Sequence, residues 1–183
     1  MNHYTIAVIV GSLRKESLNR RLADAMIRLA PQDFSFTDVQ IGDLPLYNQD
    51  DEVSPSEPVI RLRREIREAD GLLFVTPEYN RSIPGLLKNA LDQASKPSGQ
   101  NAWGGKPSGI MGISPGAIGT ALAQQHLRNI LACLDVPTLG QPEAFIQSKE
   151  GLFDEDGGIG VASRAFLQGW MDKYAAWIRL HTS

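Results

Sequence analysis

Apolar and polar positions follow one another along this chain in a pattern that predicts strands and helices in turn. Continuous apolar runs at residues 5–10 and 71–75 are too short for helices and rich in branched side chains, which predicts strands buried on both faces. Residues 34–39 alternate between apolar and polar, as is typical of an outer strand. A run of small residues at 107–113 and an interrupted segment at 138–146 complete the predicted strands.

Segments between and after these strands repeat apolar residues every three or four positions, which predicts amphipathic helices. They are residues 17–30, 56–69, 84–94, 117–134 and 162–180. The last has a long apolar side, formed by Phe166, Leu167, Trp170, Met171, Tyr174, Trp177 and Ile178. A helix after each strand indicates an α/β fold with a mainly parallel sheet and helices on both faces. Because the chain shows no internal repeat and no linker, we expect one domain over residues 1–183.

Composition and charge narrow the choice of partners. The chain has 18 Lys and Arg against 21 Asp and Glu, a net charge of −3. That balance argues against nucleic acid as a partner, because nucleic-acid binders usually carry a basic excess. The single cysteine, Cys133, lies in an apolar helical run, which predicts a small buried side chain. Because the sequence has no basic leader and no apolar segment long enough to cross a bilayer, we expect a cytoplasmic protein without a membrane partner.

Ligands of open α/β sheets bind at the carboxyl ends of the strands, so we expect a ligand site in the loops that follow the strands. The first of these loops, residues 11–19, opens a helix whose positive end and free N–H groups favour an anion. It also carries short polar side chains and a guanidinium, namely those of Ser12, Arg14, Ser17 and Asn19. With Gly11 as its only glycine, the loop suits a terminal monophosphate better than a pyrophosphate. The alternative is an ordinary capped helix start with solvated charges.

The second loop, residues 77–82, follows the most apolar strand and is bracketed by prolines. Tyr79 offers a flat face and a phenol, while Glu78 and Asn80 offer polar edges. A flat heteroaromatic ring is the guest that this combination favours. The alternative is a helix start with an exposed tyrosine.

The third loop, residues 112–120, is rich in small residues that let a ring lie against the main chain. Ser114 can form a hydrogen bond to the edge of such a ring, although these glycines could also make a simple turn. The histidines do not have the spacing of metal ligands, so we expect no metal site. His126 in particular favours a role in helix packing or in a subunit contact.

Two of these loops carry a longer resemblance. Residues 11–19 read GSLRKESLN, and residues 76–92 read TPEYNRSIPGLLKNALD. Both resemble motifs of the NADPH-dependent FMN reductase family, which has a flavodoxin-like fold, and the match is closest to its bacterial chromate/quinone reductase branch. The resemblance implies a doubly wound, five-stranded parallel sheet of order 2-1-3-4-5 and a bound FMN.

Carried over by position, the resemblance also implies which residues hold FMN. Those at the phosphate are Ser12, Arg14, Ser17, Leu18 and Asn19. Those at the ring are Pro77, Glu78, Tyr79 and Asn80, partly through their main chain, with Ser114 and Gly116 on the other side. Tyr79 and Arg81 are the candidates for contact with the nicotinamide or the substrate. Arg81 departs from the family pattern, in which a neutral or aromatic residue is expected at this position, and Gln93 stands where tryptophan is frequent.

The activity implied by the resemblance is a ping-pong reaction at one site. NADPH or NADH would deliver a hydride to flavin N5, and an acceptor such as a quinone, chromate, an azo compound or free flavin would then take the electrons. No catalytic side chain is required, because the flavin carries the chemistry. The family also implies a homodimer or homotetramer. The alternative is a flavodoxin-like, FMN-binding electron carrier without efficient NAD(P)H oxidation, against which the modest acidity of the chain argues.

Overall fold

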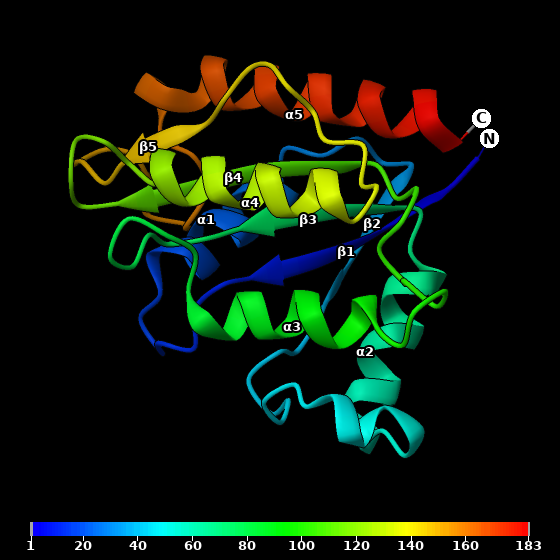
Figure 1. The fold of residues 1–183 in the computed structure, drawn as a ribbon. Helices are drawn as coiled ribbons and strands as arrows, with labels where there is room; N and C mark the ends of the chain where they lie inside the picture. Colours follow the sequence, from blue (N-terminus) through cyan, green and yellow to red (C-terminus); the bar gives the residue numbers. More distant parts are fainter. Residues whose placement is uncertain (1, 183) are drawn as a thin grey trace.

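The computed structural model describes residues 2–182 and contains one sheet of parallel strands (Figure 1). The strands are β1 (Tyr4–Val10), β2 (Phe34–Asp38), β3 (Gly71–Val75), β4 (Ser108–Ser114) and β5 (Phe145–Gln147). Their order across the sheet is β2-β1-β3-β4-β5, and each neighbouring pair is parallel. The predicted flavodoxin-like arrangement is therefore confirmed.

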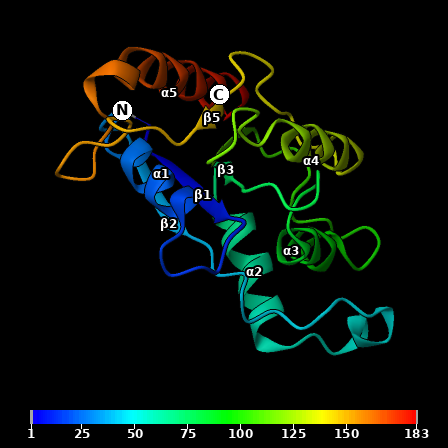
Figure 2. The same cartoon turned by 90° about the vertical axis from the view of Figure 1, so that its left-hand side faces the viewer.

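Helices cover both faces of this sheet. They are α1 (Leu18–Ile27), α2 (Glu57–Glu68), α3 (Gly85–Ser95), α4 (Ala121–Cys133) and α5 (Val161–Thr182), with a short 3₁₀ helix η1 (Gln49–Val53) before α2. Side chains of α1 and α5 pack on one face, and those of α2, α3 and α4 pack on the other. Figure 2 views the molecule from the carboxyl ends of the strands, with the helix layers on the two sides of the sheet.

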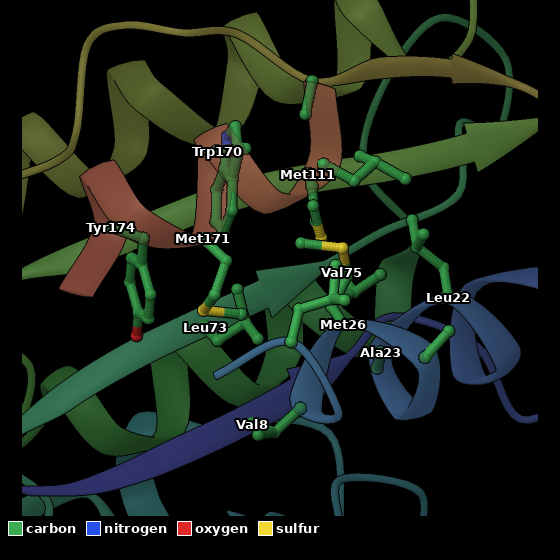
Figure 3. Close-up of a cluster of buried hydrophobic side chains, with 14 of the residues drawn as sticks. Val8, Leu22, Ala23, Met26, Leu73, Val75, Met111, Trp170, Met171 and Tyr174 are labelled. Carbon is green, nitrogen blue, oxygen red and sulfur yellow. The ribbon is translucent and has the colours of Figure 1, made fainter. Parts of the chain in front are cut away.

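The central strands supply both hydrophobic cores because successive side chains point to opposite faces. On β3, Leu73 and Val75 face α1 and α5, whereas Leu72 and Phe74 face the other helices. Figure 3 shows the first of these cores, in which side chains of α1 and α5 meet over β3 and β4. All five residues of β3 are buried, so the apolar run at 71–75 is explained.

Aromatic residues of α5 fasten that helix to the sheet. The rings of Trp170 and Tyr174 stack with centroids 5.3 Å apart. The Tyr174 hydroxyl donates a hydrogen bond to the Leu72 carbonyl at 3.0 Å, and burial raises the pKa of Tyr174 well above its usual value. Phe166, which was predicted on the same apolar side, is instead half exposed and lines a surface hollow with Phe145.

Besides Phe166, two sequence predictions need correction. The helix predicted from residue 117 begins only at Ala121, because Gly119 adopts a left-handed conformation with φ of 64° in the preceding turn. The interrupted strand predicted over 138–146 is confirmed as β5 and an isolated bridge between Ser108 and Thr138, and the gap holds the proline at 142, which cannot donate to a ladder. Cys133 is exposed rather than buried.

The exposure of Cys133 follows from helical geometry. The buried apolar residues of α4 are Ala123, Leu127 and Leu131, spaced four apart on one side. Cys133 comes two residues after Leu131, which turns its side chain to the opposite side of the helix. Within residues 2–182, none of these helices is both long and apolar enough to cross a bilayer.

Candidate functional site

The three loops singled out in the sequence meet at the carboxyl edge of β1, β3 and β4. Together they line a hollow of about 170 Å³. Its lining residues are Ser12, Arg14, Ser17, Leu18, Asn19, Pro77, Glu78, Tyr79, Ile113, Ser114 and Pro115. Of the predicted FMN contacts, Asn80 and Gly116 do not line this hollow, and each directly follows a residue that does. Arg81, predicted to contact the nicotinamide or the substrate, also lies outside the lining. The topology therefore brings together residues as far apart in the sequence as Ser12 and Pro115.

The start of α1 contributes to the lining of the hollow. Ser17 is the N-cap residue, and its Oγ accepts a hydrogen bond from the Arg20 N–H at 3.2 Å. This confirms the capping role that the sequence left as an alternative, and it leaves the Ser17 hydroxyl proton available as a donor. The N–H groups of Leu18 and Asn19 belong to the first turn and have no carbonyl of their own helix to pair with. Together with the exposed Arg14 guanidinium, they form a donor set for an anion.

The side chain of Asn19 also has a structural role, which its position in the motif does not indicate. Its Nδ2 donates to the Ile113 carbonyl at 3.0 Å, and its Oδ1 accepts from the Ile113 N–H at 3.0 Å. Both polar ends of a 3 % exposed side chain are thus used to hold the end of β4 against α1. The main-chain N–H of Asn19, in the first turn of α1, is a further group that a ligand in the hollow could contact.

The second loop contains a tight turn between Tyr79 and Ser82. The two residues exchange main-chain hydrogen bonds, each 3.0 Å long. Between them, Asn80 and Arg81 have φ of 53° and 67°, the pair of left-handed residues that closes a two-residue hairpin. Asparagine tolerates this conformation, whereas arginine is strained in it. The turn leaves the ring of Tyr79 half exposed beside the hollow.

Glu78 lies just before this turn and caps a different helix. One of its carboxylate oxygens, Oε2, accepts hydrogen bonds from the N–H groups of Leu122 (3.0 Å) and Ala123 (3.1 Å) at the start of α4. The other, Oε1, lies 3.8 Å from the Arg81 guanidinium. At the far end of the turn, the Ser82 hydroxyl is 3.0 Å from His126 Nδ1. The contacts of Glu78 with α4 and of Ser82 with His126 could not be expected from the sequence, because their partners are 44 or 45 residues apart.

The third loop is shaped by its own hydroxyl and by two glycines. Ser114 Oγ donates to the Gly119 carbonyl at 2.6 Å, which closes the loop on itself. A Cβ at Gly119 would lie 2.7 Å from the main chain of Phe145. A Cβ at Gly112 would lie 2.1 Å from Thr120 Oγ1, so the loop can approach α4 only through glycine.

A buried polar pair supports this loop from below. Gln124 is fully buried, and its Nε2 donates to Thr120 Oγ1 at 3.0 Å and to the Ala144 carbonyl at 2.9 Å. Because unpaired polar groups are costly in a core, these contacts fix the start of α4 relative to the segment before β5. Thr120 and Gln124 were not among the predicted site residues, since an isolated threonine and glutamine in a helical pattern carry no specific signal.

The donor set of the hollow fits a flavin mononucleotide. The lining from the first loop and the start of α1 offers first-turn N–H groups, hydroxyls and Arg14, which suit a terminal phosphate. The lining from the second and third loops offers the Tyr79 face and the main chain of small residues, which suit a flat ring.

The chain is similar to a family of known FMN reductases and to known quinone reductases. The family model of NADPH-dependent FMN reductases matches residues 4–151. The chain is 56 % identical over 175 residues to a 2-hydroxy-1,4-benzoquinone reductase from Burkholderia sp., covering 95 % of this chain and 96 % of that protein. It is 51 % identical over 179 residues to a quinone reductase from Pseudomonas putida, covering 97 % and 96 %.

Solved structures give the same result. The flavoenzyme NAD(P)H:(acceptor) oxidoreductase FerB from Paracoccus denitrificans superposes with a TM-score of 0.93 at 46 % identity, covering 97 % of this chain and 98 % of that one. A more distant NADH:FMN oxidoreductase, at 24 % identity and a TM-score of 0.70, shares the fold. These matches favour an enzyme over the flavodoxin-like electron carrier. The chain therefore belongs to the NADPH-dependent FMN reductase family, and it is an oxidoreductase that uses FMN and NAD(P)H.

Proposed function

We propose that this protein passes electrons from NADPH or NADH to quinones. The observation that carries the proposal is the convergence of three loops on one hollow, whose lining includes both a set of anion donors and the half-exposed Tyr79. The relatives named as quinone reductases support a quinone as the acceptor. Bound FMN supplies the hydride and electron chemistry, while the side chains bind and orient it.

The roles of the loop residues are part of this proposal. Ser12, Ser17 and Arg14 hold the phosphate together with the main-chain N–H groups of Leu18 and Asn19. Pro77, Glu78 and Tyr79, which line the hollow, would hold the ring together with Asn80, and Ser114 and Gly116 would close the site. Arg81, which is 65 % exposed at the tip of the turn, is placed to attract the anionic electron donor.

Steady-state kinetics of the purified protein test the acceptor. With NADPH as donor, we expect the largest kcat/KM for 2-hydroxy-1,4-benzoquinone and unsubstituted benzoquinone, and lower values for chromate, an azo dye and free FMN. Parallel lines in double-reciprocal plots of rate against quinone at several NADPH concentrations would support the ping-pong order. Efficient chromate or azo-dye reduction with negligible quinone reduction would overturn the choice of acceptor. Because the reaction consumes NAD(P)H, we assign it to the cytoplasm.

We further propose that residues 1–183 form one domain that assembles as a homodimer or homotetramer; residues 1 and 183 lie outside the described part. The single domain is supported by the core that β1 and α5 share although they come from opposite ends of the chain. Assembly is supported by an open hollow of about 670 Å³ between α3 and α4, which has Ile83 and Ile130 in its lining. The segment around η1 stands away from the sheet and exposes Val53, at 92 % (Figure 1).

Light scattering after size exclusion tests the assembly. We expect a dimer or tetramer for the native chain and a smaller species for Ile130→Arg, which places a charge in the hollow between α3 and α4. A native monomer at micromolar concentration would remove this part of the proposal.

A further inference from the structure

The turn at Asn80 and Arg81 is attached to α4 on both sides. Before the turn, Glu78 Oε2 accepts from two N–H groups of the first turn of α4, at 3.0 and 3.1 Å. After it, Ser82 Oγ contacts His126 Nδ1 at 3.0 Å, about one helical turn further along. The two contacts come from independent side chains, and together they hold both ends of a strained turn against one helix.

The contact with Glu78 also caps the N-terminus of α4. Thr120 occupies the N-cap position of α4 without forming a side-chain cap. The carboxylate of Glu78 takes over this task from another part of the chain, and its side chain is only 11 % exposed. A helix N-terminus carries about half a positive charge, so the contact also offsets the charge of a nearly buried carboxylate.

Glu78 is one of the residues that line the hollow, together with Pro77 and Tyr79. Electron transfer into a ring bound there adds negative charge, and an uncompensated carboxylate at the wall would oppose it. The partial positive charge of the N-terminus of α4, if Glu78 did not cap it, would favour this electron transfer. The position of Glu78 is therefore expected to affect the binding of the cofactor, and its charge is expected to affect the cofactor's reduction potential.

We propose that Glu78, assisted by the Ser82–His126 pair, is a positioning residue that attaches the turn at residues 79–82 to α4, and that its charge sets the reduction potential of the bound flavin. The inference rests on the proposed function, because it takes this hollow as the flavin site. Glu78 acts on the ring through the turn and through its charge. His126 acts only through Ser82.

Two substitutions of Glu78 separate position from charge. Because a single oxygen accepts both N–H groups, the amide oxygen of Glu78→Gln can replace it, whereas Glu78→Ala removes the attachment. In FMN titrations of the apoprotein, we expect Glu78→Ala to weaken binding about tenfold, the size of one lost cap, and Glu78→Gln to stay within about threefold. Amide exchange of Leu122 and Ala123 in the apoprotein should accelerate in Glu78→Ala alone.

The charge is tested by the midpoint potential of the FMN-loaded protein. We expect both variants to shift it to a more positive value, because each removes a negative charge from the wall of the hollow. Glu68→Gln, which removes an exposed carboxylate of α2, serves as the control and should leave the potential unchanged. An unchanged potential in Glu78→Gln would overturn the role of the charge.

The second attachment is tested at His126. Asparagine places a polar atom near the position of Nδ1, so we expect His126→Asn to retain FMN affinity and His126→Leu to lose about threefold, with faster FMN release. Native affinity in both Glu78→Ala and His126→Leu would overturn the inference. The proposed function would survive that result if Arg14→Ala still weakened FMN binding. Native affinity in all three variants would instead show that FMN binds elsewhere.

Discussion

The side-chain amide of Asn19 and the main chain of Ile113 exchange two hydrogen bonds, each 3.0 Å long, across 94 residues of sequence. One partner lies in the first turn of α1 and the other near the end of β4. The contact therefore joins the loop proposed to hold the phosphate to the loop proposed to close the ring site. It is a structural tie within the candidate site, made by a residue whose motif suggested only a ligand contact.

Asn19→Ala should destabilise the apoprotein by about 2–4 kcal/mol, because it leaves a buried N–H and a buried carbonyl of Ile113 without partners. Urea unfolding in the absence of FMN measures this loss. Ser17→Ala removes only the α1 cap and should cost about 1 kcal/mol. Equal losses in the two variants would contradict the importance of the tie to β4.

Gly112→Ala should destabilise the protein by about 2–4 kcal/mol, since the new Cβ would lie 2.2 Å from the Thr76 carbonyl oxygen, which cannot move without distorting β3. Gly116→Ala is the matched control in the same loop. There the nearest atom would be Ser114 Oγ at 3.8 Å, so the expected loss is below about 1 kcal/mol. Thermal unfolding of the apoproteins would show whether the order is as stated.

Arg14→Ala should weaken FMN binding about tenfold, because it removes a fixed positive charge from the end of the hollow. The residue is exposed, so the stability of the apoprotein should not change. Lys15→Ala removes the neighbouring charge, which does not line the hollow, and should change the affinity less than threefold. Fluorescence titrations at low and high salt make the comparison, and equal losses in both variants would point to a diffuse field instead of a phosphate contact.

The fold and the place of the site follow from the sequence because both depend on local patterns. Apolar runs such as residues 71–75 predict buried strands, and the rule that ligands bind where parallel strands end selects the three loops that line the hollow. The contacts of Glu78 and Asn19 could not be predicted, because a carboxylate or an amide in a loop has many possible partners far along the chain. Phe166 and Cys133 were wrongly predicted to be buried. The spacing of apolar residues identifies a helix, but it does not show which of its residues face the sheet.

The stability of the protein should depend on pH through Glu65, whose pKa is raised mainly by burial, although Arg61 and Arg64 lower it. A carboxyl group with a raised pKa in the folded state favours folding below its unfolded pKa of about 4.5, and that contribution is lost as the pH rises through the folded value. Glu65→Gln should therefore become more stable than the native chain as the pH rises from 4 towards 7. Glu68→Gln removes an exposed carboxyl group from the same helix and serves as the control for the loss of one charge.

Arg81→Ala should raise the KM for NADPH more than the KM for NADH, by about threefold to tenfold, if the exposed guanidinium attracts the extra phosphate of NADPH. The charge is free to act outwards because its contact with Glu78 is long, at 3.8 Å. Initial rates at fixed quinone concentration measure both constants. Arg81→Lys keeps the charge and should retain most of the preference.

Strain at Arg81 can be separated from its charge by comparing alanine with glycine. Both variants lose the guanidinium, but only glycine adopts a φ of 67° without cost, so Arg81→Gly should be more stable than Arg81→Ala by about 1 kcal/mol. If charge recognition is correct, the two variants should show the same rise in KM for NADPH despite this difference in stability. A rise in Arg81→Ala alone would mean that the shape of the turn, held by Tyr79 and Ser82, determines binding of the electron donor.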